Sequence, residues 1–142
     1  MKRIYLLLLP ALLVLASCSE DDPTPREILI ENEWLVTSYL ITEDNVTEDI
    51  VSSQDPCDSD NYFDFLDNGN YIVYDGDNKC NATDPDIVYS AGFAFDEAQS
   101  KLTIDGVTLN ATTLNETTMI VEGAVDDDLG EVYIVKITFS RR

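Results

Sequence analysis

The sequence predicts an all-β domain, a single eight-stranded antiparallel up-and-down barrel. Two hairpin signals support this: Asp67-Asn68-Gly69-Asn70 and Asp105-Gly106 contain residues that tolerate the positive φ of tight turns, and each lies between runs of β-forming residues. Residues 87–95 also alternate clearly: one face has Ile87, Tyr89, Ala91, Phe93 and Phe95, and the other has Val88, Ser90, Gly92 and Ala94. Closing the sheet into a barrel would remove the exposed edges of such a meander.

The strands are expected in short runs joined by turns, with no long helix between them. The eight predicted strands span residues 34–41, 62–66, 71–74, 87–95, 101–104, 107–109, 117–122 and 132–139. Residues 28–33 are expected to form one short helical turn before the first strand. Two longer polar segments, 42–60 and 75–86, are predicted to be loops, and the acidic run 126–128 a turn.

The first eighteen residues have the pattern of an export signal. Lys2 and Arg3 precede an apolar run, residues 4–15, which is shorter than the roughly 20 residues of a membrane span. The segment ends in Leu15-Ala16-Ser17-Cys18, which resembles a bacterial lipobox, whose cysteine becomes the lipidated first residue of the mature protein. An ordinary signal peptide with an incidental cysteine, or a short membrane anchor, are the alternatives.

We therefore divide the chain into three parts: a lipoprotein signal peptide at 1–17, a lipidated acidic tether at 18–29 and the barrel domain at 30–142. Ser19-Glu20-Asp21-Asp22 follows the cysteine and resembles the surface-export signal of Bacteroidetes lipoproteins. The resemblance implies a lipid-anchored protein of the outer membrane that is exposed on the cell surface. A solvated spacer on a protein facing the periplasm is the alternative.

The charge of the chain excludes one class of partner. Its 28 acidic residues against 8 basic ones give a formal net charge of −20, spread over the length of the sequence. Binding to nucleic acid requires a basic surface, so no nucleic-acid partner is expected. Adhesion to anionic lipid is disfavoured for the same reason.

The chain has three cysteines and no histidine. If lipid occupies Cys18, then Cys57 and Cys80 remain, and an even pair in an oxidising compartment predicts a disulfide. Two free or metal-bound thiols are the alternative, although the absence of histidine and of a second cysteine pair argues against zinc.

No set of residues predicts catalysis, a metal or a cofactor. Without histidine, Ser-His-Asp and Cys-His arrangements cannot form, and a Gly-rich phosphate loop is also missing. Asp75-Gly76-Asp77-Asn78 is similar to part of a calcium loop but lacks the closing glutamate, so it is interpreted as a polar turn. We expect a protein that is not an enzyme.

Six short motifs follow one another along the chain: Trp34 to Ser38, Asn61 to Phe65, Asp67 to Tyr71, Gly92 to Phe95, Lys101 to Ile104 and Leu114 to Val121. Their order resembles that of the lipocalin-like domain found in many Bacteroidetes lipoproteins, over about residues 30–140. The aromatic Phe93 stands where tryptophan is common, and Glu33 before Trp34 departs from the Gly-x-Trp signature of true lipocalins. The resemblance implies an eight-stranded barrel whose mouth can hold a ligand.

The expected function is binding of a small apolar ligand by a membrane-anchored barrel. The aromatic residues expected to line the site are Trp34, Phe63, Phe65, Tyr89, Phe93 and Tyr133. Ser38, Tyr39 or Thr103 would orient the ligand, and Phe95 and Phe139 complete the aromatic set. The same aromatics could instead simply fill the barrel, which at eight strands is just wide enough for either outcome.

A competing interpretation is a surface interaction module. The loops at 42–60 and 75–86, joined through Cys57 and Cys80, would then contact a protein or glycan, and the barrel would be only their scaffold. A continuous cavity would favour ligand binding, whereas a packed interior beneath exposed aromatic loops would favour the module.

Overall fold

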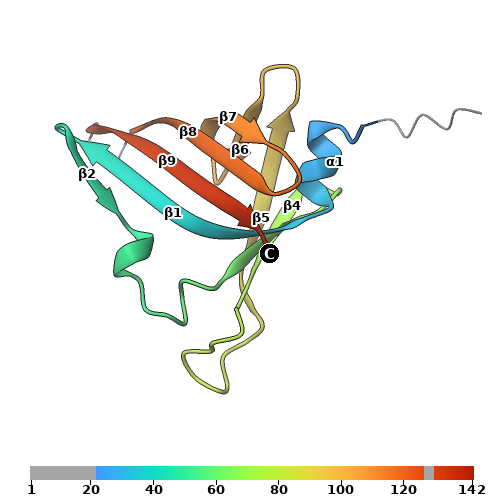
Figure 1. Cartoon of the computed structure of the whole chain (residues 1–142), viewed down its shortest axis with the longest axis vertical. Coiled ribbons are helices and arrows are strands. Elements are labelled where there is room, and N and C mark those ends of the chain that lie inside the picture. The colour runs from blue at the N-terminus through green and yellow to red at the C-terminus, as the bar shows by residue number, and fades with distance from the viewer. Residues whose placement is uncertain (1–21, 127–129) are drawn as a thin grey trace, which may run out of the picture.

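The computed structural model describes residues 22–126 and 130–142 (Figure 1). The predicted signal peptide and Cys18 lie outside these residues, as do Asp127 and Asp128 of the predicted acidic turn. Within the described ranges, no helix combines the length and the apolar character needed to cross a bilayer.

The predicted fold class is confirmed: the chain forms a closed antiparallel barrel of eight strands, with one extra strand beside it. Each barrel strand pairs with the next barrel strand along the chain, and β1 also pairs with the last strand, β9, which closes the barrel (Figure 1). The barrel strands are β1 (Glu33–Glu43), β3 (Tyr62–Phe65), β4 (Asn70–Tyr74), β5 (Ile87–Asp96), β6 (Lys101–Ile104), β7 (Val107–Leu114), β8 (Thr118–Asp126) and β9 (Val132–Arg141).

The extra strand, β2 (Val46–Asp49), corrects the prediction of one continuous loop over residues 42–60. It pairs with the end of β1 through a two-residue turn at Asp44 and Asn45, whose φ angles are 46° and 65°. Positive φ at both central positions matches the twist of the flanking strands, and Asp and Asn tolerate it. A short 3-10 helix, η1 (Val51–Ser53), follows, so the irregular part of the loop begins only at residue 54.

The helix α1 (Pro25–Ile30) begins earlier than the turn expected at 28–33 and includes residues assigned to the tether. Thr24 accepts a hydrogen bond from the Glu27 amide and Glu27 reciprocates at the Thr24 amide, a capping box that starts the helix. Leu29 is fully buried, and its carbonyl accepts a 3.0 Å bond from Trp34 Nε1. The helix is therefore part of the folded domain, where it contacts β3 and β7 (Figure 1).

The packed core fills the half of the barrel next to α1. Its largest fully buried side chains come from the helix and from six different strands. Phe65 packs edge-on against Phe93, with ring centroids 5.0 Å apart. These fully buried residues are Leu29, Trp34, Phe65, Tyr71, Leu102, Met119, Val121 and Phe139. Because the described residues form a closed sheet with its own core, we expect residues 22–142 to fold without the preceding segment.

Candidate ligand cavity

The other half of the barrel is hollow. A cavity of about 360 Å³ lies between the packed core and the end of the barrel that carries the β6–β7 turn. Fifteen residues line it, and they come from all eight barrel strands and that turn: Val36, Tyr39, Phe63, Tyr71, Val73, Tyr89, Ile104, Asp105, Val107, Leu109, Val125, Tyr133, Val135, Ile137 and Phe139.

The period-two alternation of the strands directs these side chains inward. In β9 the residues Tyr133, Val135 and Ile137 face the cavity, whereas Val132 and Ile134 are 58% and 49% exposed. Because the wall consists mostly of Val, Ile, Leu and aromatic side chains, it favours an apolar occupant over water.

The polar part of the wall is centred on Asp105, the one charged residue among the described residues that line the cavity. The Tyr71 hydroxyl donates a 2.6 Å hydrogen bond to Asp105 Oδ2, and the Tyr89 hydroxyl donates one of 3.2 Å to Oδ1. The two tyrosine rings are themselves in contact, with centroids 5.9 Å apart. We call these three residues the Tyr71–Asp105–Tyr89 cluster.

Both tyrosines of this cluster stay protonated. Burial, followed by the hydrogen bond to Asp105, raises the pKa of Tyr71 well above its usual range. The hydrogen bond to Asp105 is the main reason that the pKa of Tyr89 is raised as well. Tyr71 is almost fully buried, whereas Tyr89 is 48% exposed, so the cluster runs from the interior of the barrel to its surface.

A second pair of tyrosines, Tyr39 and Tyr133, also lines the cavity. Burial raises the pKa of Tyr39, and the neighbouring Tyr133 adds to the effect. The sheet is irregular just before Tyr39, between Val36 and Ser38. There Asp49 accepts bonds from the Tyr39 amide (3.2 Å) and the Ser38 hydroxyl (3.1 Å), so β2 helps to hold this wall.

The aromatic residues predicted to line a site divide into two groups. Phe63, Tyr89 and Tyr133 line the cavity, as does Tyr39 of the polar residues. Trp34, Phe65 and Phe93 lie instead in the packed half and do not reach the cavity.

The other predicted polar residues also lie away from the cavity. The hydroxyl of Ser38 bonds to Asp49, and that of Thr103 to Thr108. Sequence reasoning missed Tyr71 and Asp105, because Asp105 carries the signal of a hairpin turn and nothing in its surroundings marks a site.

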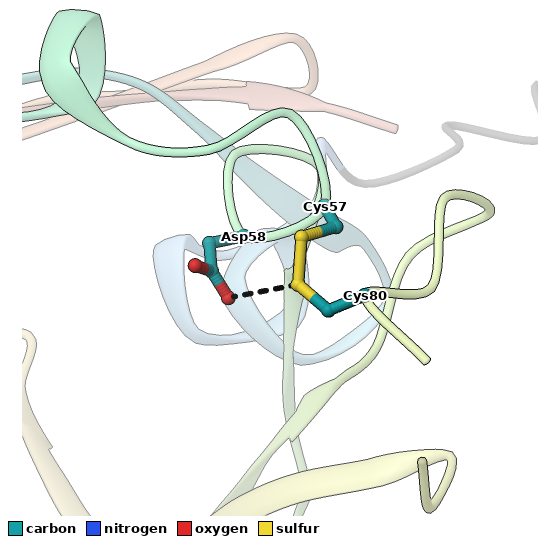
Figure 2. Close-up of side chains that lie close together, drawn as sticks. All are labelled: Cys57, Asp58 and Cys80. Atoms are coloured by element: carbon teal, nitrogen blue, oxygen red, sulfur yellow. Dashed lines mark hydrogen bonds between the residues drawn. A yellow bond between two sulfur atoms is a disulfide. The ribbon is translucent and has the colours of Figure 1, made fainter. Parts of the chain in front are cut away.

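The predicted disulfide is confirmed. Cys57 and Cys80, 23 residues apart, are bonded with their Cα atoms 5.1 Å apart, and they join the loop after η1 to the β4–β5 loop (Figure 2). Asp58 Oδ1 lies 3.9 Å from the Cys80 sulfur. These three residues meet the spacing of a metal site, but bridged sulfurs are not thiolates and cannot act as its ligands.

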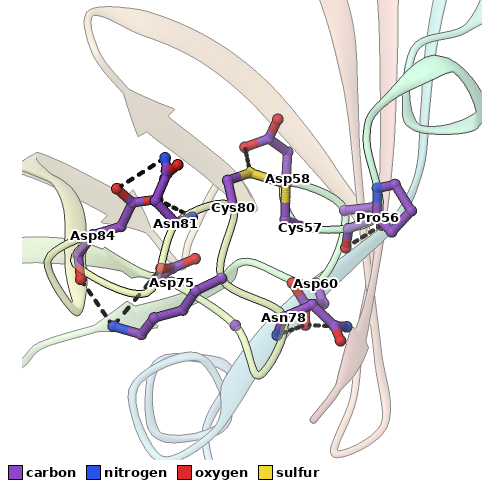
Figure 3. Close-up of a disulfide and its surroundings, with 12 residues drawn as sticks. Pro56, Cys57, Asp58, Asp60, Asp75, Asn78, Cys80, Asn81 and Asp84 are labelled. Carbon is purple, nitrogen blue, oxygen red and sulfur yellow. Dashed lines mark hydrogen bonds and ion pairs between the residues drawn. A yellow bond between two sulfur atoms is a disulfide. The ribbon is translucent and has the colours of Figure 1, made fainter.

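Internal polar contacts also hold the two joined loops together (Figure 3). Asp60 accepts bonds from both the amide and the side chain of Asn78, each 2.9 Å long, and thereby links the loops a second time. Lys79 binds Asp86 at 2.6 Å and lies 3.9 Å from Asp75. The acidic residues of this region thus order the loops locally.

No protein-family model matches the chain, and no curated protein matches it significantly.

Proposed function

We propose that the protein is a lipid-anchored lipoprotein of the lipocalin-like type found in Bacteroidetes, and that its barrel binds a small, mostly apolar ligand. The observation that carries this proposal is the hollow half of the barrel, with its cavity of about 360 Å³. Pockets for small molecules span roughly 300–1,000 Å³ and are lined mainly by apolar and aromatic side chains. Transfer of an apolar ligand from water to such a wall contributes about 25 cal/mol for each Å² buried.

The cavity favours ligand binding over the interaction module. A barrel that only presents loops gains stability from a fully packed interior, and each unfilled volume costs it free energy. Here the half beside α1 is packed and the other half is open. The uneven filling is what a binding protein requires, because the packed half supplies the stability and the open half the site.

We infer binding rather than catalysis. Asp105 is the charged group of the cavity wall, and each of its oxygens already accepts a tyrosine hydrogen bond. These two bonds fix the direction of the carboxylate and leave it able to accept further hydrogen bonds from a ligand. The cluster is therefore better suited to orienting a ligand than to converting it.

The proposed membrane anchor depends on lipidation of Cys18, and replacing this cysteine tests the anchor. Cys18→Ala should prevent lipidation and move the protein from the membrane fraction to the soluble fraction, since stable anchoring needs acyl chains. Fractionation of cells with and without the substitution measures this, and Ser17→Ala is the matched control that keeps the cysteine. Equal membrane retention of both variants would contradict the lipid anchor. If lipidation is confirmed, labelling of intact cells with a membrane-impermeant amine reagent would separate surface exposure from a periplasmic orientation.

Filling the cavity should abolish ligand binding. We expect octanol, a neutral apolar probe, to shift the NMR resonances of the cavity residues when it is added to the protein of residues 22–142. The Val125→Trp variant of the same protein should show no such shifts, because the indole ring occupies the cavity. Ala124→Trp is the matched control: Ala124 is exposed and precedes Val125 in β8, so the same side chain is added outside. Binding that survives Val125→Trp unchanged would contradict the proposed site.

A further inference from the structure

We propose that the ligand carries a protonated amine next to its apolar body, and that Asp105 binds this amine. The inference rests on the proposed function and adds the chemical class of the ligand. It follows from the position, hydrogen bonding and charge of the Tyr71–Asp105–Tyr89 cluster.

The backbone fixes Asp105 at the rim of the cavity. Asp105 and Gly106 form the two-residue turn between β6 and β7, with φ angles of 50° and 82°. Asp105 is solvent-exposed yet lines the cavity, so its carboxylate is at the boundary between solvent and the apolar wall. An amphiphilic ligand would place its polar group at this boundary.

The carboxylate is oriented but not saturated. Tyr71 and Tyr89 donate one hydrogen bond to each oxygen. A carboxylate can accept about four hydrogen bonds, which leaves capacity for roughly two more from a ligand. An ammonium group is a matching partner, because it only donates, and its hydrogen bonds to a carboxylate are charge-assisted.

The surrounding rings favour a cation as well. The rings of Tyr71 and Tyr89 are in contact with each other, and both line the cavity together with Tyr39 and Tyr133. A cation within about 6 Å of such a ring is attracted by its quadrupole. The remaining wall, with Val107 and Leu109 among its members, would contact the apolar body of the ligand.

The same features disfavour an anionic ligand. A fatty acid would bring its carboxylate to Asp105, and the described lining has no Lys or Arg to offset the repulsion. The net charge of −20 adds a weaker, long-range repulsion that salt screens. For ligands of equal chain length we therefore expect the affinity to be highest for an amine, lower for an alcohol and lowest for a carboxylate.

A purely structural role for Asp105 predicts a different result. Tyr71 is buried, so its hydroxyl needs a hydrogen-bond partner whether or not a ligand binds. If Asp105 served only this need, its replacement would weaken all ligands alike. The preference for an amine over an alcohol therefore separates the two roles.

Calorimetric titration of octylamine, octanol and octanoate into residues 22–142 tests the proposal. These residues contain the closed barrel without the predicted lipid anchor, so the titration is made without detergent that could compete for the cavity. We expect octylamine to bind about tenfold more tightly than octanol, a difference of about 1.4 kcal/mol, because its hydrogen bond to the carboxylate is charge-assisted. Octanoate should bind most weakly of the three.

Two variants assign the preference to Asp105. Asp105→Asn replaces the carboxylate with an amide that has no charge but can still bond to the tyrosines. In this variant the affinities for octylamine and octanol should agree to within about twofold. Glu116→Gln removes one charge from the exposed β7–β8 turn at the α1 end, and should keep the preference. Equal losses in both variants would show general attraction to an acidic protein and overturn the assignment.

The outcomes for wild-type protein stand even if a variant fails to fold. Octanol binding without a preference for octylamine would overturn the amine proposal and leave the apolar site intact. Failure of all three probes to bind would overturn the proposed function itself.

Discussion

Trp34→Ala should lower the free energy of unfolding by about 3–5 kcal/mol, the usual cost of truncating a large buried aromatic residue. Trp34 is fully buried at the start of β1 and links the barrel to α1 through its bond to the Leu29 carbonyl. The substitution therefore leaves a cavity and also weakens the docking of the helix. Urea unfolding of residues 22–142, followed by tyrosine fluorescence or circular dichroism, measures the change.

Trp34→Phe separates the two contributions. It retains most of the buried ring but leaves the Leu29 carbonyl without its donor, which costs about 1–3 kcal/mol. A loss below about 1 kcal/mol for Trp34→Ala, typical of an exposed position, would contradict the packing of this half of the barrel.

Loss of the disulfide should have the second-largest effect on stability. Replacing both Cys57 and Cys80 with alanine should lower the free energy of unfolding by about 3 kcal/mol, because the bridge restricts a loop of two dozen or so residues in the unfolded chain. Thermal unfolding of the oxidised protein and of the double variant measures the difference.

Reduction of the wild-type protein is the matched control for this variant, since it opens the same bridge without changing the sequence. The two should unfold at similar temperatures. Because neither cysteine lines the cavity, octanol should bind the double variant as it binds the parent protein at temperatures where both are folded. Unchanged stability after reduction would mean that polar contacts between the loops, such as the bonds of Asn78 to Asp60, are sufficient to hold them together.

The barrel was predictable because its signals are local. The turn at Asp67 to Asn70 and the alternation of residues 87–95 depend on neighbours in the sequence, and all eight predicted strands are present. The strand β2 (Val46–Asp49) was missed because it has only four residues, two of them acidic, and its composition is that of a loop. Its partner β1 stabilises it, and such pairing cannot be recognised from the segment alone.

The location of the cavity was less predictable than the fold. Alternation identifies the side chains that point inward, but it does not show which half of the interior they fill. That division depends on α1, whose Leu29 packs at one end, and on the gathering of Trp34, Phe65 and Phe93 near it. The aromatic residues that were predicted as one group therefore lie partly in the packed core and partly in the cavity wall.

The polar cluster depends on contacts between distant parts of the sequence. Tyr71 and Asp105 are 34 residues apart and meet because β4, β5 and β6 are consecutive strands of the sheet. Tyr89 joins them from β5. Each residue alone has an ordinary structural explanation, and only the folded sheet brings them together.

Native mass spectrometry after incubation with an extract of the host cells tests the central claim most directly. Residues 22–142 and the cavity-filled variant Val125→Trp are compared side by side, with Ala124→Trp as the control. The account predicts a bound small molecule, released on denaturation, in the parent protein and in Ala124→Trp but not in Val125→Trp. Unliganded masses for all three proteins, or the same bound mass in all three, would contradict binding in the barrel cavity.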